Sequence, residues 1–248
     1  MANLSGKVAV VTGGNSGIGF STAQKFKEDG ADVIIAGRSA EKVEKAAQEL
    51  GIKGLVADVS DLAAINRLVE QVQAEVNSVD ILFINAGVFF PTPVGHISEE
   101  LYDTQMNINF KGAVFTLEKF LPILNEGASV INLSSINAYT GMANTAIYAA
   151  SKAAMNSYTR TAATELAPRK IRVNAVNPGP IETPIFGKSG LSEEQLSGFA
   201  ESVQGKVLLN RFGNPAEVAN LVSFLASDDA KFITGGEYNV DGGMTILN

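Results

Sequence analysis

The sequence of 248 residues contains no cysteine, no tryptophan and a single histidine, His96. The absence of cysteine excludes disulfide bonds, thiolate metal sites and cysteine nucleophiles. A Ser–His–Asp triad or a multi-histidine metal site would have to depend on His96 alone, so we expect neither. If the protein is an enzyme, its proton chemistry is expected to belong to tyrosine, lysine or a carboxylate.

Positive charge is also scarce. The formal net charge is −7, and no run of Lys or Arg is longer than two residues. A nucleic-acid partner is therefore not expected, because such proteins carry a basic patch. The first residues, MANLSGKVAVVTGG, contain no long apolar segment preceded by basic residues. We expect neither a signal peptide nor a membrane anchor, no membrane partner, and a cytoplasmic location.

Short apolar segments alternate with helical patterns along almost the whole chain. Strands are predicted at 7–12, 32–36, 53–57, 80–85, 128–134, 171–176 and 237–242. Helices are predicted at 17–29, 40–50, 61–76, 98–124, 145–167 and 215–226, and Ser98, Asp61 and Asn214 are candidate helix caps. Continuous Val, Ile and Leu indicate strands buried on both faces, as in a parallel sheet. The pattern predicts one Rossmann-type α/β domain over 1–248, with a doubly wound, mainly parallel seven-stranded sheet flanked by helices on both faces.

One segment departs from this alternation. Residues 184–208 are polar, punctuated by glycine and only partly helical in pattern. Excursions of this kind often cover binding sites, so we expect a substrate lid here.

A glycine-rich stretch, TGGNSGIG, follows the first predicted strand and opens the first helix. Gly13, Gly17 and Gly19 have the spacing G-x-x-x-G-x-G. Glycines at such a turn let the backbone approach a pyrophosphate, which the helix N-terminus then attracts. The alternative is a glycine-rich turn that binds no ligand. The predicted cofactor contacts from this stretch are Gly13, Asn15, Ser16, Gly17, Ile18 and Gly19.

The end of the second predicted strand bears on the choice of cofactor. An NAD site usually has a carboxylate there to bind the ribose 2′-hydroxyl. In this sequence Gly37 occupies that place, and Arg38 and Ser39 follow it. A guanidinium can bind a 2′-phosphate and stack on adenine. NADP is therefore favoured and NAD stays possible, since Arg38 could also be an ordinary solvated arginine.

The segment YAASK places Tyr148 four residues before Lys152. On a helix, residues with this spacing lie on the same face, so the phenol and the ammonium can approach one small volume. The alternative is a surface Tyr–Lys pair with no chemical role.

Taken together, these segments resemble the short-chain dehydrogenase/reductase family, in its compact single-domain branch. The resemblance covers essentially the whole chain. It is carried by motifs in the family's order: TGGNSGIG (12–19), NAG (85–87), Asn109 in NINFKG, Ser135 in INLSS, YAASK (148–152) and NPGPIET (177–183).

The resemblance implies roles for four side chains. Tyr148 would be the general acid/base, and Lys152 would bind the nicotinamide ribose. The ammonium and an oxidised nicotinamide would lower the pKa of the phenol from about 10. Ser135, with Ser134 as the alternative, would orient the substrate carbonyl. Asn109 would bend its helix and hold a water that links Lys152 to solvent.

Further contacts are predicted on both sides of the nicotinamide. On the cofactor side they are Arg38, Ser39, Asp58, Val59, Asn85, Ala86, Gly87, Pro178, Gly179, Ile181 and Thr183, with Asn85 expected mainly to brace the sheet. The predicted substrate walls are Val88, Phe89, Phe90, Ile136, Asn137, Met142, Pro180, Ile185 and Phe186. These walls are mostly apolar and carry no Lys or Arg, so a neutral substrate is expected.

The function predicted from the sequence is an NADP(H)-dependent carbonyl reductase or alcohol dehydrogenase acting on a neutral ketone or secondary alcohol. One alternative is a 3-oxoacyl-[acyl-carrier-protein] reductase. Another, from a different class, is a non-catalytic cofactor-binding regulator.

Ser16 stands where many NADP-using members of the family carry a basic residue. The resemblance also implies a homotetramer, with interfaces formed by helices 98–124 and 145–167 and by the last helix and strand.

Overall fold

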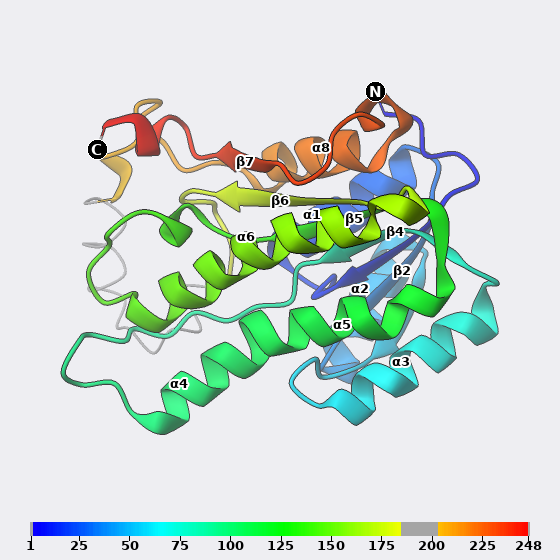
Figure 1. The fold of residues 1–248 in the computed structure, drawn as a ribbon, viewed down its shortest axis with the longest axis horizontal. Coiled ribbons are helices and arrows are strands. Elements are labelled where there is room, and N and C mark those ends of the chain that lie inside the picture. Colours follow the sequence, from blue (N-terminus) through cyan, green and yellow to red (C-terminus); the bar gives the residue numbers. More distant parts are fainter. Residues whose placement is uncertain (1, 185–202, 248) are drawn as a thin grey trace.

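The computed structural model describes residues 2–184 and 203–247. The described residues form a seven-stranded sheet in the order β3-β2-β1-β4-β5-β6-β7 (Figure 1). All pairs of neighbouring strands are parallel. The strands are β1 Val8–Thr12, β2 Asp32–Gly37, β3 Lys53–Val56, β4 Val79–Ile84, β5 Leu124–Leu133, β6 Arg172–Pro178 and β7 Glu237–Val240. The predicted fold class is confirmed.

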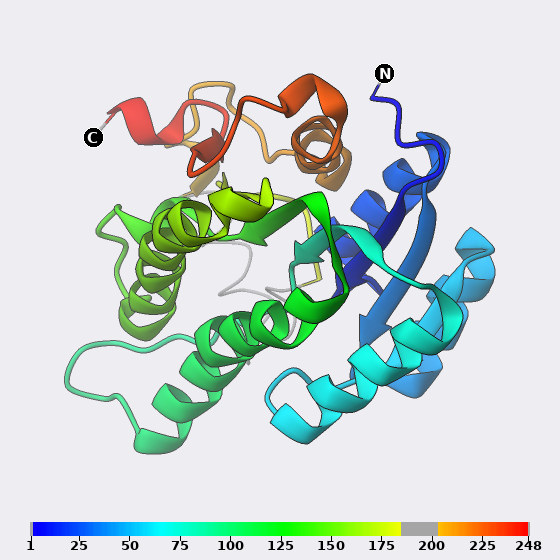
Figure 2. The same ribbon diagram turned by 45° about the vertical axis from the view of Figure 1, so that its right-hand side comes forward.

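Helices cover both faces of the sheet (Figure 2). They are α1 Gly17–Glu28, α2 Ala40–Leu50, α3 Leu62–Glu75, α4 Glu99–Met106, α5 Gly112–Phe120, α6 Ala146–Leu166 and α8 Pro215–Ala226. Apolar residues of α3, α5 and α6 pack on one face, and those of α1, α2 and α8 pack on the other. Alternate strand residues point to opposite faces, so Val10 joins the first core while Ala9 and Val11 join the second. Both faces are buried, as the strand composition indicated.

Three predicted helix caps are confirmed. The Ser98 hydroxyl accepts from the amide of Leu101 at 3.2 Å. The carboxylate of Asp61 accepts from the amide of Ala63 at 2.9 Å. Asn214 forms a capping box at the start of α8. Each side chain satisfies amide groups that have no partner within the helix.

The predicted helix over 98–124 is wrong in its interior. Between α4 and α5 the chain forms a π-helical turn, η1 Asn107–Lys111. A 3₁₀ turn that contains Pro122 ends this segment, and β5 begins at Leu124, four residues earlier than predicted. Proline disfavours a continuing helix because it lacks an amide hydrogen. π-Turns inside α-helices are frequently found at functional sites. Asn109, a predicted site residue, lies inside η1.

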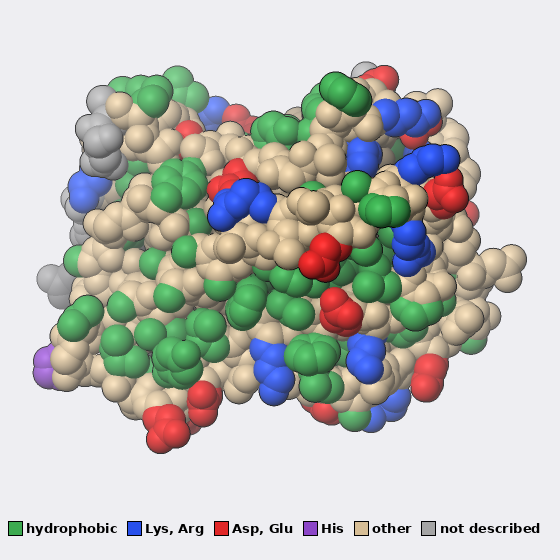
Figure 3. Space-filling model, in the orientation of Figure 1, with side chains coloured by type: hydrophobic (Ala, Val, Ile, Leu, Met, Phe, Trp, Pro, Cys, Tyr) green, Lys and Arg blue, Asp and Glu red, His purple; other side chains and the backbone are tan. Residues whose placement is uncertain are grey.

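The outer face of α5 and α6 carries apolar side chains among charged ones (Figure 3). Figure 3 shows hydrophobic side chains gathered over these helices. Phe110 and Tyr158 are partly buried there, and their rings meet edge to face at 6.3 Å between centroids. In the part of the chain that the structure describes, no helix is long and apolar enough to cross a membrane.

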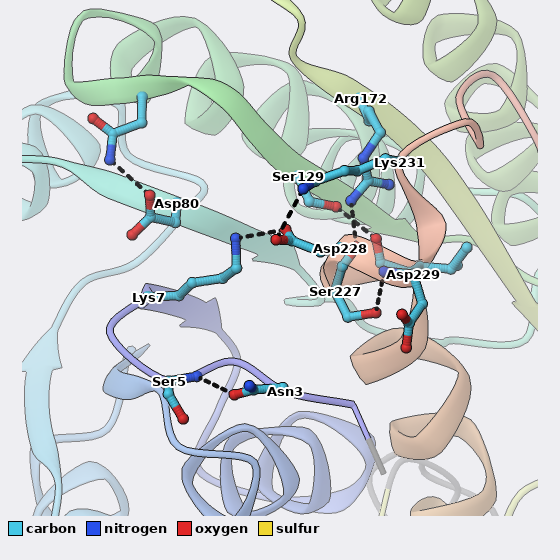
Figure 4. Close-up of polar contacts among 12 residues, drawn as sticks. Asn3, Ser5, Lys7, Asp80, Ser129, Arg172, Ser227, Asp228, Asp229 and Lys231 are labelled. Carbon is cyan, nitrogen blue, oxygen red and sulfur yellow. Dashed lines mark hydrogen bonds and ion pairs between the residues drawn. The ribbon is translucent and has the colours of Figure 1, made fainter.

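Hydrogen bonds and ion pairs connect the amino-terminal ends of β1 and β6 to the segment that follows α8 (Figure 4). The buried guanidinium of Arg172, at the start of β6, donates to the carbonyl oxygens of Ser227 and Ile233, both at 3.3 Å. Lys7 and Lys231 each pair with the exposed carboxylate of Asp228 at 3.0 Å. The buried bonds of Arg172 are worth more than the solvated ion pairs.

Replacement of Arg172 by Ala is expected to lower the free energy of unfolding by about 3 kcal/mol, because it leaves two carbonyl groups without their charged donor. Lys231→Ala removes only an exposed ion pair and is expected to cost less than about 1 kcal/mol. Urea unfolding of both variants at one pH measures the difference. Equal losses would show that Arg172 contributes no more than a surface charge.

Candidate active site

The candidate active site lies along the carboxyl ends of β1, β2, β3, β4 and β5, where a cleft of 600 Å³ is open. In open parallel sheets, ligands bind at this edge and at the place where the strand order reverses. Here the order reverses between β1 and β4. The predicted cofactor residues that line the cleft are Gly13, Asn15, Ser16, Gly17, Ile18, Arg38, Ser39, Asp58, Val59, Asn85, Ala86, Gly87, Tyr148, Lys152 and Thr183.

The glycine loop is built by close backbone approach. Gly13 and Gly17 have φ values of 65° and 55°, a region that favours glycine. A Cβ on Gly19 would lie 2.3 Å from the carbonyl oxygen of Gly13, so Gly19 packs the helix under the loop rather than lining the cleft. The loop leads directly into the N-terminus of α1, Gly17–Glu28. This cradle fits the pyrophosphate of a dinucleotide.

Asn85 fixes the loop to the sheet, as predicted. Its side-chain amide donates to the carbonyl oxygens of Thr12 at 2.9 Å and Gly13 at 3.1 Å. In return, the Thr12 hydroxyl accepts from the backbone amides of Asn85 at 3.0 Å and Ala86 at 3.2 Å. The ends of β1 and β4 are thus held together from both sides.

The end of β2 has no carboxylate of the kind an NAD site uses, and the side chain of Asn15 occupies the space beside Gly37. A Cβ on Gly37 would lie 2.4 Å from Oδ1 of Asn15 and 3.0 Å from a methyl carbon of Val43. Arg38 and Ser39 line the cleft beside this point, and Lys42 joins them. The sequence analysis missed Lys42. Its signal was the spacing of four residues from Arg38 across the start of α2, where Ser39 is the N-cap.

Asp58 lies in the cleft wall, but its carboxylate is engaged locally. Oδ1 accepts from the backbone amide of Ser60 at 2.9 Å and from its hydroxyl at 2.7 Å. The predicted contact of Asp58 with adenine stays a prediction.

Tyr148 and Lys152 lie one turn apart on α6, as the helical spacing indicated, and Nζ of Lys152 is 5.7 Å from the centroid of the Tyr148 ring. Lys152 is only 4% exposed, and its ammonium donates to the carbonyl oxygen of Leu133 at the end of β5, at 2.7 Å. Burial lowers the pKa of Lys152 from 10.5 to about 8, because a charged amine is costly in a low-dielectric site.

For the phenol, burial decides the direction of the pKa shift in the protein without cofactor. Burial raises the pKa of Tyr148 above its usual value of 10, and a hydrogen bond with Ser135 opposes the rise. Desolvation disfavours the phenolate more than the neighbouring groups favour it. The further effect of an oxidised nicotinamide stays a prediction.

The two serines at the end of β5 have different partners. The Ser134 hydroxyl donates to the carbonyl oxygen of Lys152 at 3.0 Å and is thereby tied to the helix backbone. The Ser135 hydroxyl is close enough to the Tyr148 phenol to oppose the rise of its pKa, and it accepts from the amide of Asn137 at 3.2 Å. This arrangement favours Ser135 over Ser134 as the group that meets a substrate oxygen.

Asn109 connects the π-turn to the loop that follows β4. Its Oδ1 accepts from the amide of Val88 at 2.8 Å, and its Nδ2 donates to the carbonyl oxygen of Val88 at 2.9 Å and to the hydroxyl of Ser151 at 3.3 Å. A Cβ on Gly87 would lie 3.3 Å from Oδ1 of Asn109 and 3.7 Å from Nζ of Lys152. Asn109 and Lys152 therefore border the same space, while the linking water stays a prediction.

A second cavity adjoins the cleft and shares Tyr148 with it. Of the predicted substrate residues, it is lined by Ile136, Asn137, Met142, Pro180 and Phe89. The sequence analysis missed Thr145, Val203 and Met244 in this wall. These come from the start of α6, the far end of the predicted lid and the C-terminal turn, which no local pattern brings together.

Several predicted contacts are placed differently from expectation. Val88 and Phe90 line the cofactor cleft and not the second cavity. Pro178, Gly179 and Ile181, predicted for the cofactor, line the second cavity. Ile185 and Phe186, with most of the predicted lid 184–208, lie outside the described residues. Within its described end, Val203 and Val207 are buried against Ile136 and Met244.

Among residues 2–184 and 203–247, no cluster of three or more His, Asp or Glu side chains could hold a metal ion. The polar side chains that line the two cavities are hydroxyls, amides, the cations Arg38, Lys42 and Lys152, and the carboxylate of Asp58. The geometry is that of an NAD(P)-dependent oxidoreductase, with a dinucleotide cleft and a separate small-molecule cavity that meet at a tyrosine.

Comparison with known proteins agrees with this class. The family model described as "Enoyl-(Acyl carrier protein) reductase" matches residues 13–245. The chain is 40% identical to the oxidoreductase asL5 of Sarocladium schorii, over 98% of each chain. It is 37% identical to the 3-oxoacyl-[acyl-carrier-protein] reductase FabG of Thermotoga maritima, covering 98% of this chain and 99% of the relative. It is 36% identical to the NADP-dependent (R)-specific alcohol dehydrogenase of Lentilactobacillus kefiri, over 98% of each.

Solved structures of the same fold are similarly close. Levodione reductase superposes with a TM-score of 0.93 at 30% identity, covering 99% of this chain and 100% of that one. A blue fluorescent protein from a metagenomic library, in complex with NADPH, has a TM-score of 0.89 at 34% identity, covering 98% and 99%. The chain belongs to the short-chain dehydrogenase/reductase family.

The buried ammonium of Lys152 predicts a pH-dependent stability. Below pH 8 the folded protein must hold a buried charge, whereas the unfolded chain keeps its lysine protonated up to about pH 10.5. The unfolded state thus binds more protons between these values, and stability rises with pH through this window. Relative to Lys152→Met, the wild-type protein is expected to gain about 3 kcal/mol between pH 7 and pH 10.5.

Denaturant unfolding of the two proteins across this pH range tests the expectation, because the other titrating groups cancel in the difference. A stability difference that stays flat with pH would mean that Lys152 is not desolvated. Lys45→Met, which changes an exposed lysine of α2, is the matched control and should show no such slope.

Proposed function

We propose that the protein interconverts a neutral, mostly apolar ketone and its secondary alcohol with NADP(H), using Tyr148 as the acid/base. The observation that carries this proposal is the position of the Tyr148 side chain, which lines both the dinucleotide cleft and the adjoining cavity, where Ser135 also lies. A proton donor at that junction can reach an oxygen whose carbon faces the cofactor.

The roles of the side chains follow from their surroundings. When bound, NADPH supplies the hydride that is added to the carbonyl carbon. Tyr148 gives its proton to the carbonyl oxygen, and Ser135 holds that oxygen by a hydrogen bond. The ammonium of Lys152, held near the phenol by its hydrogen bond to the carbonyl oxygen of Leu133, stabilises the phenolate that remains. In alcohol oxidation the same groups work in reverse, with the phenolate as the base.

The adjoining cavity supports a neutral substrate. Its described lining contains no Lys, Arg, Asp, Glu or His side chain. A charged substrate group would be desolvated there without a counter-ion, which is costly. The polar side chains present are hydroxyls and one amide, which suit a carbonyl or hydroxyl oxygen.

Tyr148→Phe is expected to lower kcat for ketone reduction by about 100-fold or more, because it removes the proton donor. Tyr102→Phe, at an exposed position on α4, is the matched control and should retain full activity. Since burial raises the pKa of Tyr148, the phenol stays protonated through neutral pH. Reduction should therefore persist there while alcohol oxidation increases toward alkaline pH.

Steady-state rates with NADPH and a panel of neutral ketones, measured from pH 6 to 10, test this assignment. Full activity in Tyr148→Phe would remove Tyr148 from the chemistry. Absence of turnover with tight NADPH binding in the wild-type protein would instead favour the non-catalytic regulator.

The preference for NADP rests on the end of β2. The site has no carboxylate at Gly37, and two cations, Arg38 and Lys42, line the cleft next to it. Lys42 would supply the second positive charge that is absent at Ser16. The names of two similar proteins, an NADP-dependent alcohol dehydrogenase and a fluorescent protein in complex with NADPH, agree with this preference.

Arg38→Ala and Lys42→Ala are each expected to raise the KM for NADPH about 10-fold, the effect of one lost charge-assisted hydrogen bond. The KM for NADH, which has no 2′-phosphate, should change little. Lys45→Ala is the control, because Lys45 is exposed on the same helix but does not line the cleft. Equal effects on NADPH and NADH would show that neither cation recognises the 2′-phosphate.

A second candidate is reduction of a 3-oxoacyl thioester on an acyl-carrier protein. It is supported by the description of the family model and by the similarity to the reductase of Thermotoga maritima. An acyl thioester in the ketone panel, offered both free and on the carrier protein, distinguishes the two. A large gain in kcat/KM from the carrier would favour this candidate.

We also propose that the chain is one domain and assembles as a homotetramer. One sheet carries both cores, which supports the single domain. The apolar side chains on the outer face of α5 and α6, Phe110 and Tyr158 among them, support an interface between copies of the chain (Figure 3). Light scattering of the purified protein measures the assembly.

A further inference from the structure

The helix that carries Tyr148 needs a cap that its own residues do not provide. Tyr148 is the third residue of α6, in the first turn, where amide groups have no partner within the helix. Thr145 is the N-cap residue, but it makes no side-chain cap hydrogen bond. Its hydroxyl donates instead to the carbonyl oxygen of Met142 at 2.8 Å.

Thr92 supplies this cap from another part of the chain. Its hydroxyl oxygen accepts from the backbone amide of Ile147, the residue before Tyr148, at 3.1 Å. Its own amide donates to the carbonyl oxygen of Asn144 at 2.8 Å, and Thr92 and Thr145 form an isolated β-bridge. Thr92 is fully buried, so solvent does not compete for these bonds.

The loop that leaves β4 thereby reaches Tyr148 in two ways. The ring of Phe89 meets the Tyr148 ring edge to face, at 5.3 Å between centroids and 85° between planes. Three residues later, Thr92 holds the backbone immediately before Tyr148. The aromatic contact restricts the movement of the Tyr148 ring, and the cap fixes the helical turn that carries this side chain.

We propose that Thr92 is a positioning residue for Tyr148. The inference rests on the proposed function, since Tyr148 must be the acid/base for its position to affect the rate. Without the hydroxyl, the amide of Ile147 loses its partner, and the first turn of α6 can unwind or shift. A displacement of about 1 Å in a reacting group can reduce a rate about 100-fold.

The experiment compares Thr92→Val with Thr92→Ser. Valine keeps the shape of threonine but removes the acceptor, whereas serine keeps the hydroxyl. Thr92→Val is expected to lower kcat for ketone reduction by about 10- to 100-fold and to leave NADPH binding, measured by fluorescence titration, unchanged. Thr92→Ser should restore most of kcat.

Asp61→Ala is the matched control for a purely structural effect. Asp61 caps α3, a helix that lines neither cavity, and its loss should reduce stability without changing kcat. The positioning role would be overturned if Thr92→Val kept wild-type kcat while Tyr148→Phe was inactive. It would also be overturned if Thr92→Ser failed to restore the rate.

A second readout does not require turnover. Hydrogen exchange at the amide of Ile147 should be faster in Thr92→Val, and unchanged in Asp61→Ala. The ultraviolet titration of Tyr148, obtained as the difference from Tyr148→Phe, should also shift in Thr92→Val. If the wild-type protein proved inactive on every substrate, the proposed function would fail. The role of Thr92 as the cap would be overturned separately, if hydrogen exchange at Ile147 and the titration of Tyr148 were both unchanged in Thr92→Val.

Discussion

The paired hydrogen bonds between Asn85 and the end of β1 are the constraint on which the site depends. They hold the carbonyl oxygens of Thr12 and Gly13 against the end of β4. This places the glycine loop over the N-terminus of α1, with Gly19 packed under Gly13. The same contact fixes where the loop after β4 begins, and Asn109 then fastens that loop at Val88. The glycine loop and the loop after β4 are thus both held in place by hydrogen bonds between side-chain amides and backbone groups.

Burial sets the electrostatics of the site. Lys152 is buried and Tyr148 is partly buried, and this desolvation lowers the pKa of the amine and raises that of the phenol. Both shifts favour uncharged forms, and the carbonyl oxygen of Leu133 accepts a hydrogen bond from the ammonium. A low dielectric also strengthens the interaction between these groups and any charge that develops beside them. Burying Lys152 lowers the stability of the fold, but it also strengthens the electrostatic interaction of the site with a charge on a bound ligand.

Much of the fold could be predicted because its signals are local. The strands, most helices and the caps at Asp61 and Asn214 follow from residue patterns over a few positions. Residue patterns gave no local signal for the break at η1, and only the family resemblance implied a bend at Asn109, because the break accompanies contacts of Asn109 with Val88, 21 residues away. The placement of Val88 and Pro178 in the opposite cavity from the one expected depends on how loops turn after leaving the sheet. Motif order does not specify that turn.

By itself the sequence determined the parallel sheet, the glycine positions, the absence of a carboxylate after β2 and the helical spacing of Tyr148 and Lys152. These follow from periodicity, backbone freedom and residue identity, which act over short distances. Tertiary structure alone decided that the Ser134 hydroxyl bonds with the backbone of Lys152, that Lys42 joins Arg38, and that Thr92 caps α6. It also decided the direction of the Tyr148 pKa shift. Burial and hydrogen-bond partners depend on segments far apart in the chain, and only folding brings those segments together.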